Sequence, residues 1–204
     1  MKSTKDKILN TSRVLFNTFG YSNVTIRMIA KALQMSSGNL NYHFKKRDQI
    51  LEALYFEMVA TFDQRIEDLE TQTPTLKKMQ QEIYSSMKRM VAYKFFWTDL
   101  YNLLQINEPI KVHFDAVYER RKNGLSFVFD QLIATNMIKE FESEQQRIFL
   151  IERMITYSNT WLYASMLYSK KEFTQQFVLT QTNTLMAFLY PYLSAKGKND
   201  YQAL

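Results

Sequence analysis

Cysteine is absent from the 204 residues, and glycine and proline are scarce, with four and three copies respectively. The lack of cysteine excludes disulfide bonds and thiolate metal ligands. Few glycines and prolines, set against frequent Leu, Met, Lys, Glu and Gln, favour an all-α fold with short connections. No run of 18 uncharged apolar residues occurs, so we expect no membrane span and no membrane partner. The first residues, MKSTKDK, lead into amphipathic sequence without a continuous apolar run, so we expect no signal peptide and a cytoplasmic location.

The residue constellations of known catalytic and metal centres are also missing. The two histidines, His43 and His113, lie in different parts of the chain, which leaves paired imidazole coordination of a metal unsupported. The sequence contains no phosphate-binding loop, dinucleotide fingerprint, nucleophile elbow or HExxH motif. Carboxylates are scattered beside Lys and Arg, where solvated ion pairs are their ordinary role. We therefore expect no enzyme activity, no catalytic residue, no metal and no cofactor.

Positive charge is concentrated at the N-terminal end. Residues 1–48 hold nine Lys and Arg against two Asp, a net charge of +7, whereas residues 49–204 hold 17 basic and 18 acidic residues, a net charge of −1. Neutralising phosphates and releasing their counterions supplies much of the affinity of DNA-binding proteins, so this asymmetry fits a phosphate-binding surface. A solvated basic face is the alternative interpretation.

The stretch Thr25–Asp48 contains two short helical patterns that begin in the same way. Thr25 and Ser36 are each placed to cap a helix, because their hydroxyls can accept hydrogen bonds from backbone N–H groups of the first turn. Apolar pairs suited to a hydrophobic staple flank the caps: Val24 with Ile29, and Met35 with Leu40. Only Ala32–Met35 remain to turn the chain. Two short helices at a steep angle, the second followed by three basic residues, indicate a helix-turn-helix that reads DNA.

The second of these helices is predicted to enter the major groove. Leu40 and Phe44, spaced i and i+4, should face inward and leave the other side chains free for DNA. Asn39 and Asn41 could bond either adenine or phosphate, and Gly38 would let the backbone approach the duplex closely. The candidate DNA contacts are Thr25, Arg27, Ser36, Ser37, Gly38, Asn39, Asn41, Tyr42, His43, Lys46 and Arg47. Two alternatives stay open, because Thr25 could only cap its helix and His43 could be a packed structural residue.

Residues 8–51 resemble the N-terminal domain of the TetR/AcrR family of bacterial transcriptional regulators. The resemblance is carried by Ile8, Leu15, Phe16, Gly20, Tyr21, Thr25, Ile29, Ala30, Ser36, Gly38, Leu40, Tyr42, His43, Phe44, Asp48 and Leu51. Two departures matter: Asn41 stands where the family usually carries an aromatic residue, and Arg47 where it usually carries Lys. The resemblance implies a three-helix DNA-binding domain followed by a helical ligand-binding and dimerisation bundle, and a dimeric repressor on a palindromic operator. Because Asn41 changes what the end of its helix offers to DNA, the DNA sequence that relatives prefer does not predict the one that this chain prefers.

Hydrophobic periodicity predicts helices along the whole chain. We place the domain boundary near residue 48, with a DNA-binding domain at 1–48 and a regulatory and dimerisation domain at 49–204. Gly20 is expected to end the first helix as a left-handed cap, and the C-terminal stretch AKGKNDYQAL to be frayed. The predicted helices span about 4–19, 25–33, 37–44, 47 to 71–74, 75–93, 95–105, 109–136, 143–168 and 171–193.

The C-terminal part is rich in aromatic residues and Met, which suits a pocket for an apolar or aromatic small-molecule effector. We expect Tyr101, Tyr118, Tyr157 and Trp161 to line it. An aromatic stripe at helical spacing can equally be plain core. The effector would loosen the grip on DNA, as the family resemblance implies. A ligand-independent DNA-binding regulator and a helical protein-interaction scaffold are the alternative functions.

Homodimerisation is expected through the last two predicted helices, 143–168 and 171–193. Each shows a wide apolar face, and two such helices from each subunit could form a four-helix interface. A charge at Leu189 would then produce monomers. The alternative is that these faces are filled within one chain.

Overall fold

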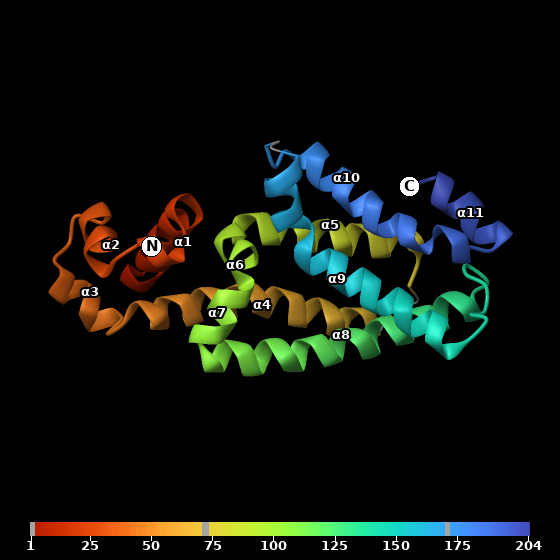
Figure 1. Ribbon diagram of the computed structural model, residues 1–204, viewed down its shortest axis with the longest axis horizontal. Coiled ribbons are helices and arrows are strands. Elements are labelled where there is room, and N and C mark those ends of the chain that lie inside the picture. The colour runs from red at the N-terminus through yellow and green to blue at the C-terminus, as the bar shows by residue number, and fades with distance from the viewer. Residues whose placement is uncertain (1–2, 71–73, 170–171) are drawn as a thin grey trace. The chain divides into compact units, whose positions relative to one another are not determined.

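The computed structural model describes residues 3–70, 74–169 and 172–204 (Figure 1). For residues 61–70 it describes the backbone alone. The described residues are almost entirely helical, and a single isolated β-bridge among them joins Ile138 to Leu193. The expectation of an all-α fold is confirmed. None of the helices within the described residues combines the length and apolar composition needed to cross a membrane. The chain divides into two compact units, and helices α4 and α8 each pass from one unit into the other.

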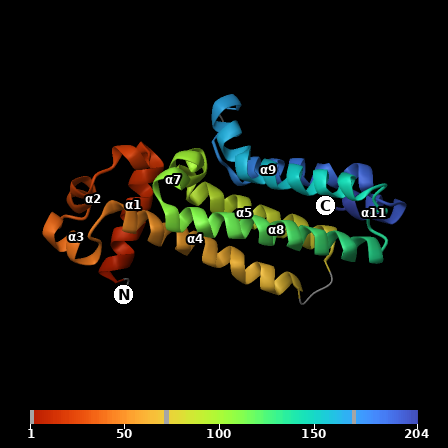
Figure 2. The ribbon, with the colours of Figure 1, turned by 60° about the horizontal axis from the view of Figure 1, so that its bottom comes forward.

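Unit 1 holds Met1–Thr61 and Tyr93–His113. Its helices α1, α2 and α3 are drawn in red and orange in Figure 1 and seen from another side in Figure 2. The elements of this unit are α1 (Thr4–Phe19), the 3-10 turn η1 (Tyr21–Asn23), α2 (Ile26–Ala32), α3 (Ser37–His43), α4 (Arg47–Glu70) up to residue 61, α6 (Lys94–Thr98), α7 (Leu100–Ile106) and the start of α8 (Glu108–Ala134). The predicted end of α4 near 71–74 lies partly outside the described residues.

Residues 1–48 are part of a larger compact unit, because α6 packs on α1. The rings of Phe16 and Phe95 lie 5.2 Å apart, and the Asn17 side-chain oxygen accepts a hydrogen bond from the Phe95 N–H at 3.1 Å. Arg13 covers the ring of Tyr93 at 5.3 Å. These contacts attach α6, which is distant in sequence, to α1.

Unit 2 holds Phe62–Ala92 and Phe114–Leu204. Within it, α10 contacts both α5 and α9, and α5 also contacts α9 and α11. Buried apolar side chains such as Met87, Met90, Leu162 and Leu185 fill the space between these helices. Besides the remainders of α4 and α8, its elements are α5 (Leu76–Ala92), α9 (Glu144–Tyr168), α10 (Gln175–Met186), the 3-10 helix η2 (Ala187–Tyr192) and α11 (Ala195–Gln202).

Two predicted helices differ from the structure at positions where the backbone hydrogen-bond pattern is interrupted. The helix expected over 95–105 is split at Asp99 into α6 and α7. The hydroxyl of Thr98 bonds the Lys94 carbonyl at 2.9 Å, and the Asp99 carboxylate accepts a bond from Asn102 at 2.6 Å. Side chains that bond nearby groups in this way compete with helix continuation.

The helix expected over 171–193 is also wrong at both ends. Residue 171 lies outside the described residues, and α10 begins at Gln175 after the cap Thr174. Beyond Met186 the helix tightens into η2, which contains Pro191. Proline has no N–H to give to the carbonyl four residues earlier, so the α-helical pattern cannot continue through it.

The C-terminal stretch is ordered into α11 rather than frayed. Ser194 caps this helix through the Gly197 N–H at 3.0 Å and donates its own hydroxyl to the Asn136 carbonyl at 2.6 Å. Gly197 is buried, and a Cβ on it would lie 1.9 Å from the Met137 carbonyl oxygen. The absence of a side chain therefore lets α11 dock on the turn that follows α8.

Gly20 has a positive φ of 80°, as the sequence predicts, but its ψ of 151° lies outside the left-handed helical region. This extended mirror-image conformation is open essentially to glycine alone. The Gly20 N–H still closes α1 on the Phe16 carbonyl at 2.9 Å, and the Tyr21 ring packs against Phe16 at 5.2 Å. The expectation that Tyr21 folds back on Phe16 is confirmed.

Candidate nucleic-acid interface

The two capped helix starts expected from the sequence are present. The Thr25 hydroxyl accepts a bond from the Met28 N–H at 3.3 Å, and the Ser36 hydroxyl accepts one from the Asn39 N–H at 3.1 Å. Helices α2 and α3 contact each other, and Leu40 and Phe44 are buried beneath α3. The two helices are thus held as a pair, with the inward positions of α3 as predicted.

The other α3 side chains remain on the surface. Gly38, Asn39 and Asn41 are exposed, Tyr42 is 85% exposed, and Ser37 and His43 are half-buried. The rings of Tyr42 and His43 lie 5.3 Å apart. On the neighbouring elements Thr25, Arg27, Ser36 and Lys46 are exposed as well. Hydrogen-bonding side chains are therefore available along α3 and at the start of α2.

Arg47 is placed differently from the other predicted contacts. Its guanidinium donates to the backbone carbonyls of Tyr21 at 3.1 Å, Ser22 at 3.3 Å and Val24 at 2.8 Å. It also stacks on the Tyr21 ring at 4.1 Å. These partners are internal to unit 1, so the structure uses Arg47 to tie the start of α4 to the turn before α2. Phosphate contact by Arg47 stays untested.

Tyr21 completes this connection. Its hydroxyl donates a short hydrogen bond to the Asp48 carboxylate, next to Arg47. Burial first, and the bond to Asp48 second, raise the pKa of Tyr21 to about 12. Tyr21, Arg47 and Asp48 form what we call the α4 latch, which fixes the chain immediately before Thr25. The sequence did not predict that these three residues form one cluster. Tyr21 and Asp48 are among the residues that carry the family resemblance, and Arg47 is one of the two departures from it.

The four predicted ligand-lining residues are divided between the two units. Tyr101 belongs to unit 1 and is 75% exposed on α7, whereas Tyr118, Tyr157 and Trp161 belong to unit 2. The Tyr157 hydroxyl bonds Gln181 at 2.7 Å. Trp161 is buried and points its indole N–H at the Met90 sulfur at 3.4 Å. Trp161 therefore packs in the interior of unit 2.

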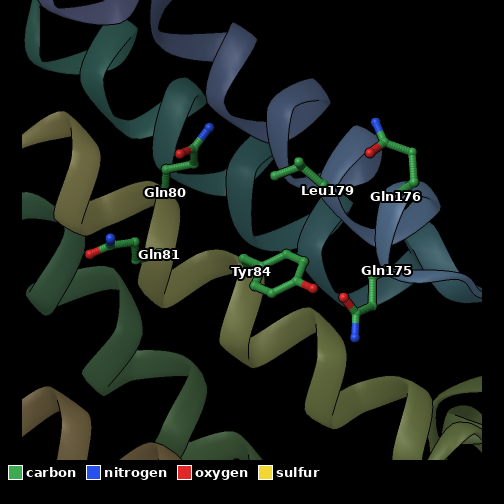
Figure 3. A pocket seen from close by; sticks show the side chains of 6 residues that line it. All are labelled: Gln80, Gln81, Tyr84, Gln175, Gln176 and Leu179. Carbon is green, nitrogen blue, oxygen red and sulfur yellow. The ribbon is translucent and has the colours of Figure 1, made fainter. Parts of the chain in front are cut away.

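A hollow of about 300 Å³ lies between α5 and α10 in unit 2 (Figure 3). None of the predicted ligand residues lines it. Four of its six lining residues carry side-chain amides, beside one aromatic ring and one leucine, and none of the six carries a formal charge. Its lining residues are Gln80, Gln81, Tyr84, Gln175, Gln176 and Leu179.

Sequence reasoning missed Arg121, a half-buried arginine on α8 in unit 2. Its guanidinium donates to the Asn159 side-chain oxygen at 2.7 Å and to the Ser158 hydroxyl at 2.5 Å, both on α9. Burial lowers its pKa to about 10, and it remains charged at pH 7. A signal was present in the sequence, because Arg121 interrupts an otherwise apolar stripe. That stripe is Phe114, Tyr118, Leu125 and Val128 at helical spacing.

The apolar faces expected to form the dimer are largely filled within unit 2. Leu189 has no exposed surface, and Ile151, Ile155, Leu162 and Leu185 are also buried. The expectation that a charge at Leu189 would produce monomers is therefore wrong in its premise, because that side chain belongs to the core of unit 2 and not to an exposed face. The exposed apolar residues of α9 lie on other positions: Ile148, Phe149, Tyr163, Met166, Leu167 and Tyr168.

Comparisons with known proteins agree with this architecture. A family described as bacterial regulatory proteins of the tetR family matches residues 8–54, and a family described as bacterial transcriptional repressor matches residues 57–201. A crystal structure of a TetR-family transcriptional regulator from Marinobacter aquaeolei has a TM-score of 0.89 at 24% identity, covering 99% of this chain and 97% of that one.

Two curated relatives share parts of the chain. The transcriptional regulator QacR from Staphylococcus aureus is 31% identical over 116 residues, covering 52% of this chain and 60% of QacR. The probable transcriptional regulator YttP from Bacillus subtilis is 30% identical over 79 residues, covering 39% of this chain and 38% of YttP. The matches thus span less than two thirds of either relative.

Proposed function

Because the chain belongs to the TetR family of bacterial transcriptional regulators, we propose that it is a dimeric repressor that a small molecule releases from a palindromic operator. The observation that carries the proposal is the exposed polar surface of α2 and α3, set in a segment of net charge +7. Such a surface can grip phosphates and present side chains to base edges. We propose that the protein binds DNA without catalysing a reaction, and that it acts in the cytoplasm, where operator DNA lies.

The proposed DNA contacts fall into two kinds. Thr25, Arg27 and Lys46 lie where they can bond or neutralise phosphates, and they position the reader on the duplex. Asn39 and Asn41 are exposed on α3 and can bond base edges in the major groove, where paired bonds from an amide to adenine discriminate by about 1–3 kcal/mol. Ser36, Ser37, Gly38, Tyr42 and His43 complete the contact surface. Arg47 supports this surface from within through the α4 latch.

The proposed dimer uses the outer faces of α9 and α10. On α9 an exposed stripe recurs at helical spacing, namely Phe149, Thr156, Thr160, Tyr163 and Leu167. On α10 and its continuation the exposed positions Thr180, Thr184 and Ala187 are small and permit close approach of another helix. A two-fold pairing of these faces would place two readers roughly 34 Å or somewhat more apart, which fits half-sites one helical turn apart.

A charge on the α9 stripe tests the dimer. We expect Tyr163→Glu to shift the protein to monomers in analytical ultracentrifugation and to weaken operator binding, because a carboxylate would be buried against a second copy. Tyr101→Glu changes an exposed tyrosine of unit 1 and should leave the dimer intact. Leu189→Glu should instead lower the melting temperature, since it places a charge in the core. A dimeric, operator-binding Tyr163→Glu protein would show that the interface lies elsewhere.

The DNA-binding proposal is tested by gel shift against the DNA upstream of the chain's own coding sequence, where such repressors often act. We expect a shifted band at low salt and a steep loss of affinity as salt rises, because each neutralised phosphate adds about 0.9 to the log–log salt slope. No shift of any duplex at low salt would instead favour a helical scaffold that binds other proteins.

A further inference from the structure

Arg121 is a charged group in unit 2 whose observed partners are neutral. Asn159 and Ser158 accept its two hydrogen bonds, and no carboxylate pairs with it among the residues that the structure describes. Arg147, another half-buried arginine of unit 2, behaves differently, because it bonds the Asp130 carboxylate at 2.6 Å. Burying a cation without an opposite charge costs free energy that neutral hydrogen bonds only partly offset.

Apolar residues lie one or two turns from Arg121 along α8 and beside its two partners along α9. Arg121 takes the place of an apolar residue on the stripe of α8 that includes Tyr118, one turn earlier, and Val128, two turns later. On the facing helix α9, Ile155 and Leu162 flank its two partners in sequence, and both are buried. A charge in such surroundings interacts strongly with an ion that reaches it, because water screens the attraction less there.

The hydrogen bonds around Arg121 leave donors available. A guanidinium has five N–H groups, and the bonds to Asn159 and Ser158 use one each. The Ser158 hydroxyl donates to the Ile155 carbonyl at 2.8 Å, which orients its oxygen as the acceptor for Arg121. The Asn159 amide nitrogen supplies further N–H donors beside the guanidinium. Arg121 is thereby held in a fixed position by α9.

We propose that Arg121 and Asn159 bind the carboxylate of an amphiphilic monocarboxylate, whose apolar body lies against the apolar side chains of unit 2. The charge favours a monovalent anion, because one guanidinium balances one negative charge and its neighbours Ser158 and Asn159 are neutral. A carboxylate also matches the planar fork of a guanidinium, which can give it two parallel hydrogen bonds. This inference rests on the proposed function, since it names the chemical class of the effector.

The test measures binding by titration calorimetry to the full-length protein without DNA. The probes are decanoate and 1-naphthoate, each paired with its neutral amide, decanamide and 1-naphthamide. We expect each carboxylate to bind at least about tenfold more tightly than its amide, because a hydrogen bond to a charged group is worth more than one to a neutral group. The exposed neighbour Arg120, changed to Met, should preserve that preference.

Two substitutions locate the anion. Arg121→Met removes the charge with little change of volume and should abolish the preference for carboxylate over amide. Asn159→Asp keeps Arg121 and supplies the missing carboxylate from within the chain, so it should raise the melting temperature and also abolish the preference. Because Asn159→Asp retains the arginine, it remains informative even where Arg121→Met fails to fold.

Wild-type protein that binds no carboxylate, or binds carboxylate and amide equally, would overturn the anion site. Preference that persists in Arg121→Met or in Asn159→Asp would overturn it too. Gel shift distinguishes a failure of this inference from a failure of the proposed function. If a carboxylate binds through Arg121 but does not release DNA, only its role as effector is contradicted. If the protein binds no duplex at all, the proposed repressor function is contradicted.

Discussion

At the scale of single residues, arginines with the same charge have different tasks in unit 1. Arg27 is exposed on the first turn of α2, whereas the guanidinium of Arg47 is engaged by three carbonyls and by the Tyr21 ring. A guanidinium used in this way stabilises unit 1 through hydrogen bonds and stacking. The sequence alone shows two arginines beside a helix-turn-helix and does not separate these tasks.

Substitution of the two arginines should therefore affect different properties, DNA binding for Arg27 and stability for Arg47. We expect Arg27→Ala to weaken binding to every duplex and reduce the salt slope by about one, with no change in melting temperature. Arg47→Ala should lower the free energy of unfolding by about 1–3 kcal/mol, because buried carbonyls lose their donor. The measurements are anisotropy titrations at several salt concentrations and thermal unfolding. A stable Arg47→Ala protein with a reduced salt slope would show that Arg47 contacts phosphate instead.

Tyr21 makes the α4 latch sensitive to alkali. Its pKa is raised from 10.0 to about 12, so the folded protein keeps a proton that the unfolded chain releases above pH 10. The stability from this shift is present in full below pH 10 and is lost as pH rises through 12. We expect Tyr21→Phe to cost about 1 kcal/mol at pH 7 and to show a shallower loss of stability from pH 10 to 12. Tyr42→Phe, on an exposed ring, is the control. Parallel stability curves for Tyr21→Phe and wild type would contradict this role.

At the scale of elements, most helix starts were predictable, although that of α10 was missed, and several helix ends were not. Thr25, Ser36 and Ser143 each cap the helix that follows, and their hydroxyls are visible in the sequence. The break at Asp99, the change to η2 and the formation of α11 depend on local side-chain bonds or on docking against distant residues. Such tertiary effects override periodicity, which explains why the polar C-terminal stretch is helical although it resembles a loose end.

Glycines on two helices provide a matched test of this docking. We expect Gly197→Ala to destabilise the protein and expose α11 to proteolysis, because its Cβ would collide with the Met137 carbonyl. Gly124→Ala should raise the free energy of unfolding by about 0.5–1 kcal/mol, since nothing lies within 4 Å of its Cβ and alanine favours a helix. Thermal unfolding and limited proteolysis measure both. Equal stability of the two variants would mean that α11 does not depend on close approach at Gly197.

At the scale of the whole molecule, the charge distribution indicated which part of the chain holds the candidate DNA-binding surface. The excess of positive charge lies entirely within residues 1–48, and the same segment folds as the α2–α3 reader of unit 1. The candidate ligand site was harder to predict, because Tyr101 falls in another unit from Tyr118 and Tyr157, and periodicity does not reveal which helices meet. The sequence shows that Arg121 interrupts an apolar stripe, but only the structure shows that its partners on α9 are neutral.

Selection of bound duplexes from a random DNA pool, at low ionic strength, tests the central claim most directly, because it examines binding, symmetry and spacing together. A dimer that carries two α3 helices should enrich palindromic sites whose half-sites lie about one helical turn apart. Enrichment of no sequence, or of single half-sites without a symmetric partner, would contradict a two-fold DNA-binding repressor.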